Sequence, residues 1–249
     1  MENISHLLLL FGVGTLAGFI NVMAGGGSSI TLPILIFLGL DSALANGTNR
    51  VALIIQNISA ITSFKQEKYS QFPQSLKLSA LTLPGAVIGA IVATRIDNLL
   101  FQKILAVVMI GIMITIVMPD RKNKAISAGS GRQSPWIYPA MMAIGFYGGF
   151  IQVGVGFLFM AALRHLLSLD LIRVNMHKVF IIFVYTWPAL LIFFLTGNVN
   201  WVYGLVLGAG NAFGAWWSVK LSVRRGEKII RLFLVLAMLI MAAKLLRVF

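Results

Sequence analysis

The sequence predicts an all-α polytopic membrane protein with about eight transmembrane helices in two homologous repeats. A very apolar composition, a series of span-length apolar stretches and an internal repeat all point to this fold class. Of the 249 residues, 59% are hydrophobic and only 11% are charged, and the mean hydropathy is +0.91. Because soluble domains carry about 25% charged residues, this composition argues against a soluble protein with a large core.

The internal repeat extends over most of the chain. Gly18–Asn21 returns as Gly149–Gln152 with one change, and Leu38–Asp41 returns as Leu167–Asp170. The offset between matching residues drifts only from 131 to 125, as small loop deletions would cause. Further matches pair Asn46, Arg50, Gly85 and Gly89 with Asn175, Lys178, Gly210 and Gly214. Duplicated membrane units of this kind hold their substrate between the two halves.

Eight apolar stretches are long enough to cross a bilayer as helices, which takes about 20 residues each. Two shorter apolar pieces, 28–39 and 157–168, lie at matching places in the two halves, each after a glycine-rich break. Broken or re-entrant segments at matching positions indicate the binding site of a transporter. The eight long stretches are 5–23, 43–63, 75–94, 99–118, 136–154, 172–195, 201–220 and 229–248.

The predicted organisation is a first transmembrane repeat over 1–118, a basic linker over 119–135 and a second transmembrane repeat over 136–249. If the two short pieces cross, each half has five crossings and the repeats are inverted; if they do not, four crossings make them parallel. We favour eight crossings with two re-entrant or broken pieces, and the orientation of the termini stays open. Met1–His6 contains no Lys or Arg, so we expect no cleavable signal.

Composition also limits the chemistry. The chain has no cysteine, and its three histidines lack metal-site spacing, so we expect no catalytic site, no metal and no cofactor. The net charge of +13 comes mostly from bases at span ends and in loops. Such bases favour contact with anionic lipids of the bilayer, and no motif indicates a nucleic-acid partner.

The glycine-rich break of the first half is the first candidate binding element. Three glycines let the backbone bend and approach a ligand closely, and free N–H groups at a helix start attract anions. We expect Ser28 or Ser29 to cap the helix that follows. Close helix packing is the alternative explanation of the small residues. The candidate residues here are Gly25, Gly26, Gly27, Ser28 and Ser29.

The polar start of the stretch 43–63 is the second element, and most of its polar residues share one helical face. A charge within a span is costly and usually faces a cavity or a partner. Arg50 could bind an oxyanion through two parallel hydrogen bonds; its alternative roles are snorkelling or pairing with Asp41. The candidate residues here are Asn46, Thr48, Asn49, Arg50 and Asn57.

The second half offers Gln152 at its glycine break and Asn175, His177 and Lys178 at the matching helix start. Lys178 stands where Arg50 stands in the first half, so two cations could embrace one anion. His177 could couple a proton, although a lone His is more often structural.

The seven acidic residues all lie at predicted span ends or in loops. A cation transporter usually buries carboxylates, so their positions favour an anionic substrate. We expect Asp41 and Asp170 to cap the helices that follow them.

Several motifs in order resemble the TauE/SafE sulfite-exporter family over nearly the whole chain. They are Gly18–Asn21, Ala24–Gly27, Pro33, Leu38–Leu40, Gly47–Arg50, Gly85-Ala86 with Gly89-Ala90, and Gly145–Phe150. The chain differs from the family pattern at Gln152–Gly156, which lacks a proline, and at Met176–Lys178, which stands where members have Thr-Lys.

The resemblance implies a multi-pass permease of the cell inner membrane for small sulfur-containing or organic anions, such as sulfite or sulfonates like sulfoacetate. Together with the residues, it favours a secondary transporter. An anion channel, a membrane enzyme and a non-transporting accessory subunit are the alternatives. A homo-oligomer is left open.

Overall fold

The computed structural model of the chain describes residues 4–117 and 134–226, which are helical throughout apart from short connections. The predicted all-α fold class is confirmed for these residues, while the stretch 229–248 and most of the linker 119–135 lie outside them. The described helices are α1 (Ile4–Met23), α2 (Ser28–Phe37), α3 (Ser42–Gln66), α4 (Phe72–Arg95), α5 (Asn98–Val117), α6 (Ile137–Phe150), α7 (Val155–Leu167), α8 (Leu171–Leu195) and α9 (Trp201–Arg225).

Three of the described helices are long and apolar enough to cross a membrane by length and composition: Ile4–Met23, Pro73–Arg95 and Leu171–Leu195. Large apolar side chains on the outer faces of the helices are exposed, among them Leu8, Leu99 and Leu195. A bilayer provides the apolar surroundings that such faces require.

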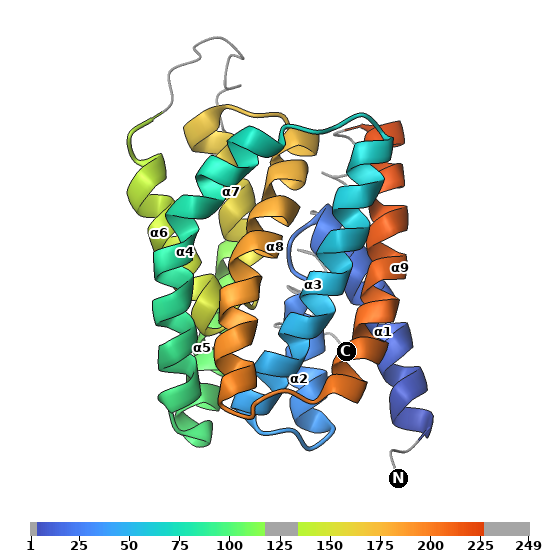
Figure 1. Cartoon of the computed structure of the whole chain (residues 1–249), viewed down its shortest axis with the longest axis vertical. Coiled ribbons are helices and arrows are strands. Elements are labelled where there is room, and N and C mark those ends of the chain that lie inside the picture. Colours follow the sequence, from blue (N-terminus) through green and yellow to red (C-terminus); the bar gives the residue numbers. More distant parts are fainter. Residues whose placement is uncertain (1–3, 118–133, 227–249) are drawn as a thin grey trace.

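The two short apolar pieces are the second arms of helical hairpins. α2 returns along α1, because Leu35 of α2 packs with Leu10 of α1 in one apolar cluster. α7 returns along α6, and the N–H of Ser134 just before α6 donates to the carbonyl of Leu166 in α7 at 3.3 Å. The two hairpins open toward opposite ends of the molecule (Figure 1).

Each hairpin packs against a helix from the other half of the chain. α1 lies along α9, so closely that a Cβ on Gly18 would come within 2.6 Å of the Cα of Asn211. α6 lies along α4 in the same way, and a Cβ on Gly149 would come within 2.7 Å of the Cα of Ala86. The small residues of these helices therefore serve the close packing that their spacing predicts.

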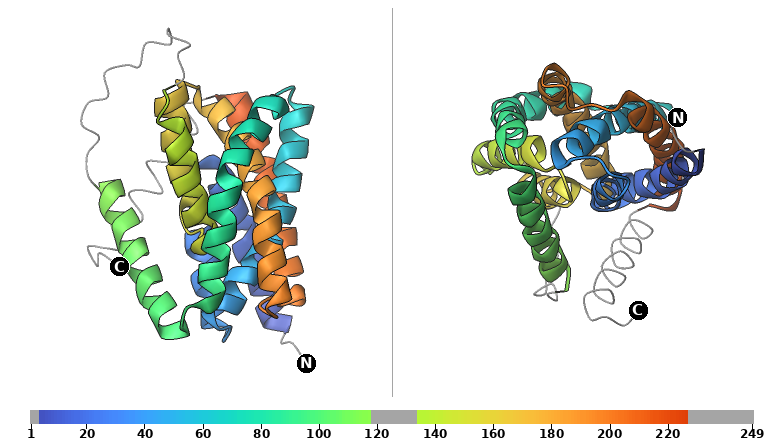
Figure 2. Two further views of the ribbon diagram at one scale, coloured as in Figure 1. Left: turned by 60° about the vertical axis from the view of Figure 1, so that its left-hand side comes forward. Right: turned by 90° about the horizontal axis from the view of Figure 1, so that it is seen from below.

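The two halves of the chain thus exchange one helix each, α4 and α9, and two helix bundles result. The first bundle contains α1, α2, α3 and α9, the second contains α4, α6, α7 and α8, and α3 and α8 pack together between them. α5 joins through Phe101, whose ring lies edge-on to that of Phe150 at 5.9 Å. Figure 2 shows the rest of α5 standing to one side of the bundles.

The helix directions follow from matched contacts. α1 runs parallel to α9, since Gly14 lies against Leu207 and Phe19 lies against Ser218. α3 also runs parallel to α9, whereas α4 runs antiparallel to α3 and parallel to α6. α1 therefore has the direction of α3, and α6 has the opposite direction, that of α4. The helices α1 and α6, which occupy matching positions in the two repeats, run in opposite directions.

The two expected aspartate caps have different outcomes. Asp170 does cap α8, because its carboxylate accepts from the N–H of Arg173 at 2.9 Å. The expected cap at Asp41 is wrong: its side chain accepts no hydrogen bond from the first turn of α3 and instead accepts from the Asn98 amide at 3.3 Å. The α4–α5 connection brings Asn98 to this end of α3, and that tertiary contact replaces the local one.

The tight α1–α9 contact makes a direct prediction for stability. Replacing Gly214 with Val places a Cβ 2.8 Å from the backbone nitrogen of Phe19, and overpacking of this kind costs about 1–3 kcal/mol. We expect Gly214→Val to lower the thermal unfolding midpoint of the detergent-purified protein. Gly12→Val is the matched control, because nothing lies within 4 Å of a Cβ at Gly12 in α1. Equal midpoints for the two variants would contradict the packing role.

Candidate functional site

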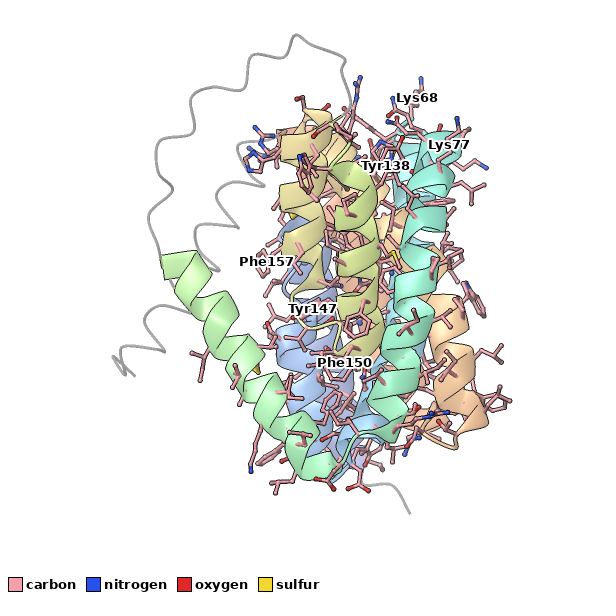
Figure 3. All side chains as sticks on the ribbon, turned by 90° about the vertical axis from the view of Figure 1, so that its left-hand side faces the viewer. Lys68, Lys77, Tyr138, Tyr147, Phe150 and Phe157 are labelled. Carbon is pink, nitrogen blue, oxygen red and sulfur yellow. The ribbon has the colours of Figure 1, made fainter. Side chains whose placement is uncertain are left out.

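The glycine breaks of the two hairpins meet in the interior of the molecule. Gly25 has φ 93°, and a Cβ on it would lie 2.5 Å from the carbonyl carbon of Gly156. A Cβ on Gly26 would lie 2.7 Å from the ring of Phe157. We call this backbone contact between Gly25 and Gly156 the hinge contact; Figure 3 shows Phe157 near mid-height, between the two ends.

Two helices begin at the hinge contact and lead away from it in opposite directions. α2 starts at Ser28 and α7 at Val155, and neither has a side-chain cap. The expected cap by Ser28 or Ser29 is wrong, because α2 has no side-chain cap hydrogen bond. The Ser29 hydroxyl instead donates to the carbonyl of Gly26 at 2.5 Å.

Several backbone N–H groups at these helix starts have no hydrogen-bond acceptor within the described parts of the chain. They belong to Gly26, Gly27 and Ser28 at α2 and to Gly154 and Gly156 at α7. Unbonded N–H groups at a helix start carry partial positive charge. Two such starts facing each other form a setting that attracts an anion.

Arg50 holds the end of the interrupted helix α6. Its guanidinium is fully buried and donates to the carbonyl of Gly149 and, at 3.3 Å, to that of Gly148. Asn46, one turn earlier in α3, donates to the carbonyl of Phe150 at 2.7 Å. We call this set of contacts the Arg50 clamp. No carboxylate of the described residues pairs with Arg50, so the alternative pairing with Asp41 is absent.

Lys178 holds the end of the other interrupted helix, α1, in a matching way. Its ammonium is buried and donates to the carbonyls of Asn21 and Val22 at 3.0 and 2.9 Å. Asn175 donates to the carbonyl of Met23 at 3.5 Å and accepts from Lys178 at 2.8 Å. We call this set the Lys178 clamp. In each clamp a cation and an Asn bind the last three carbonyls of a broken helix, where the helix dipole is negative.

The remaining candidates divide between the hinge region and the packing between helices. Asn49 accepts from Thr31 of α2 at 2.8 Å, and Gln152, with φ 57°, donates to the carbonyl of Asn46 at 3.4 Å. The amide nitrogen of Asn49 and the amide oxygen of Gln152 are buried and have no hydrogen-bond partner among the described residues. Both side chains therefore stand beside the breaks with unused hydrogen-bonding capacity.

Two candidates are engaged elsewhere. The Thr48 hydroxyl accepts from the N–H of Asn200 at the start of α9 at 2.9 Å. His177 lies 2.8 Å from the Ser75 hydroxyl of α4, on a different side of α8 from Lys178. A third candidate, Asn57, lies about two turns beyond Arg50 in α3 and is fully buried. Neither polar atom of its amide has a hydrogen-bond partner among the described residues.

Asn21, Gln56 and Tyr185 also lie at the site, although none of them was among the candidate binding residues. The Asn21 side chain donates to Gln56 at 3.2 Å, and the Asn21 backbone carbonyl accepts from Lys178 in the Lys178 clamp. Asn21 matches the candidate Gln152 in the internal repeat, and this match could have identified it from the sequence. The hydroxyl of Tyr185 is buried beside Gly148 with no hydrogen-bond partner in the described segments, and the Tyr185 ring stacks on that of Phe159 at 6.0 Å. Only the fold reveals that these groups surround the breaks.

Comparison with known proteins now adds to this geometry. The family model described as sulfite exporter TauE/SafE matches residues 10–245 of the chain. Probable membrane transporter protein YfcA of Escherichia coli (strain K12) is 31% identical over 251 residues, covering 98% of this chain and 91% of the relative. Probable membrane transporter protein ORF9 of Sinorhizobium sp is 29% identical over 244 residues, covering 97% and 93%. No solved structure matches the chain significantly.

These relatives, together with the apolar helices, make the chain a multi-pass membrane protein and a membrane transporter, and the inner membrane is typical of bacterial members of the family. The resemblance seen in the sequence is thereby confirmed. The chain belongs to the sulfite exporter TauE/SafE family.

Proposed function

We propose that this transporter is a secondary permease that moves a small oxyanion, sulfur-containing or organic, such as sulfite or a sulfonate, across the inner membrane. The observation that carries the proposal is the hinge contact, which brings together the starts of α2 and α7, whose first N–H groups have no acceptor among the described residues. A negatively charged oxygen cluster is the ligand that such groups stabilise.

The two clamps add to the positive character of this point. A broken helix places the negative end of one arm beside the positive start of the next, and the two partial charges oppose each other. Arg50 and Lys178 each bind the negative end. With the helix ends held in this way, we expect the helix starts to dominate the local potential, and the two cations to add positive charge without direct contact with the anion.

We also propose that the two halves are inverted repeats, a common plan of secondary transporters. In this arrangement α1 and α6 reach only to the interior breaks, so neither arm of a hairpin counts as a full crossing, and three crossings remain in each half, with the predicted stretch 229–248 counted in the second. The opposite directions of α1 and α6 and the exchange of α4 and α9 between the bundles support it. In such proteins access alternates between the two faces of the membrane while the site stays near the middle.

A carrier and a channel differ in a measurable way. Saturable flux that an excess of anion on the opposite side accelerates supports a carrier, whereas flux that rises linearly with concentration supports an anion channel. An accessory subunit would show no flux in reconstituted vesicles.

The proposed function predicts that the purified protein binds a small anion. In a thermal-shift screen against sulfite, sulfate, sulfonates and carboxylates, we expect at least one small oxyanion to raise the unfolding midpoint. A ligand at about 100 times its Kd stabilises the native state by about 2.7 kcal/mol. Failure of all four classes to shift the midpoint would contradict an anion site.

A pair of glycine substitutions separates the effect of disturbing the hinge contact from the effect of backbone strain alone. Gly25→Ala forces a Cβ against Gly156, so we expect it to abolish both the anion-induced shift and anion flux in vesicles. Gly39→Ala is the matched control, because Gly39 has the same φ of 93° but open space around its Cβ position. Both variants carry the strain of a non-glycine residue in that conformation. Equal loss of flux in the two would remove the evidence for a special role of the hinge contact.

A further inference from the structure

The two clamps both cross the boundary between the bundles. Arg50 belongs to the first bundle and binds α6 of the second, whereas Lys178 belongs to the second bundle and binds α1 of the first. Any rocking of one bundle against the other must therefore stretch the clamp contacts. The hinge contact also joins the two bundles, since Gly25 and Gly156 come from α1–α2 and α6–α7.

The clamps lie on opposite sides of the hinge contact. Arg50 is about two turns from the start of α3, and Lys178 is about two turns from the start of α8. α3 and α8 start at opposite ends of the molecule (Figure 1). One clamp therefore stands between the hinge contact and one face of the membrane, and the other clamp stands between it and the opposite face.

Within the described residues, the two ends of the molecule differ strongly in their number of lysine and arginine residues. We call the end where α3 and α9 finish and α4 and α8 start the basic end; Figure 3 shows Lys68 and Lys77 there. At the other end, Arg95 and Lys103 are the only lysine or arginine residues of the described segments. Each end also carries two carboxylates of these segments, Asp41 and Asp97 here and Glu67 and Asp170 at the basic end. Basic residues of the described segments at the basic end are Lys65, Lys68, Lys77, Arg164, Arg173, Lys220, Arg224 and Arg225. Lys and Arg are retained on the cytoplasmic side during insertion.

We propose that the Lys178 clamp is the gate on the cytoplasmic side and the Arg50 clamp the gate on the opposite side. The basic end is cytoplasmic, and α8 starts there, so Lys178 and Asn175 lie between that face and the hinge contact. Each gate opens when its cation leaves the carbonyls of the broken helix, while the other clamp keeps the far side closed.

The physical reason for gating lies in the burial of the cations. A buried ammonium or guanidinium that loses its acceptors must find water, because an unpaired charge in a low-dielectric interior is very costly. Release of a clamp and entry of water from that side are therefore one event. Because each clamp holds a different helix end, one can release while the other persists.

The test uses the absence of cysteine from the chain. Ser28→Cys, at the buried start of α2, supplies a single thiol beside the hinge contact. Its labelling rate by a membrane-impermeant maleimide is measured in right-side-out and in inverted vesicles, alone and combined with Lys178→Ala or Arg50→Ala. No substrate is added, so this experiment and the anion screen can fail independently, although the gate roles rest on the proposed transport function.

We expect Lys178→Ala to raise labelling about tenfold in inverted vesicles only, as happens when a conformer populated at a few per cent becomes a major one. Arg50→Ala should raise labelling in right-side-out vesicles only. Lys220→Ala is the control, because this lysine lies over the Trp216 ring at 4.9 Å in α9 and belongs to neither clamp; its labelling should equal that of Ser28→Cys alone.

A purely structural role would give a different pattern. Unfolding or general loosening exposes the reporter from both sides, and it is also detected as lost helix content by circular dichroism. Labelling raised on both sides, on the same side by both variants, or by neither variant overturns the assignment of separate gates. Lys178→Arg keeps the charge and should label more slowly than Lys178→Ala.

The assignment of sides has its own test. Ser70→Cys lies in the exposed α3–α4 connection at the basic end, and Thr196→Cys lies in the exposed α8–α9 connection at the other end. In intact cells the impermeant maleimide should label Thr196→Cys, and Ser70→Cys only after permeabilisation. The reverse pattern would exchange the two gates between the membrane faces.

Discussion

The structure depends on one requirement: the carbonyl groups at the end of an interrupted helix must find donors where no bulk water is present. α1 ends at Met23 and α6 at Phe150, both inside the molecule. A buried cation and an asparagine from the opposite bundle supply the donors at each end. Without these side chains the breaks would leave unsatisfied polar groups, so the existence of the glycine breaks and the presence of Arg50 and Lys178 explain each other.

The same arrangement explains how charge is distributed around the breaks. Cations face the helix ends, and the starts of α2 and α7 keep free N–H groups. Positive charge in a membrane interior is thus held by backbone carbonyls rather than by carboxylates, which agrees with the position of every acidic residue near a predicted span end or in a loop. Unused polar atoms of Asn49, Gln152 and Tyr185 surround this region, and they offer hydrogen bonds that a transported solute could complete.

The helical fold class, the two glycine breaks and the importance of Arg50 and Lys178 could be predicted from the sequence. Long apolar stretches, clusters of glycine and charged residues within a span are all signals that short segments of sequence carry. The sequence also matched Arg50 with Lys178 through the repeat. It could not show what these cations bind, since their acceptors are backbone carbonyls of helices far away in the chain, and a carbonyl has no residue signature. The partners of Thr48 and His177, Asn200 and Ser75, were equally hidden, because they belong to distant parts of the chain that only the fold brings near. The Ser29 hydroxyl donates to the carbonyl of Gly26, three residues earlier, a local bond that composition does not determine.

The exchange of α4 and α9 between the bundles also affects how the protein is made. α1 leaves the ribosome early, yet its glycine face fits against α9, which begins at Trp201. During synthesis that face has only lipid or a temporary neighbour to contact until most of the chain has been inserted. Assembly of the first bundle is therefore a late step in biogenesis, and contacts so distant along the chain form slowly.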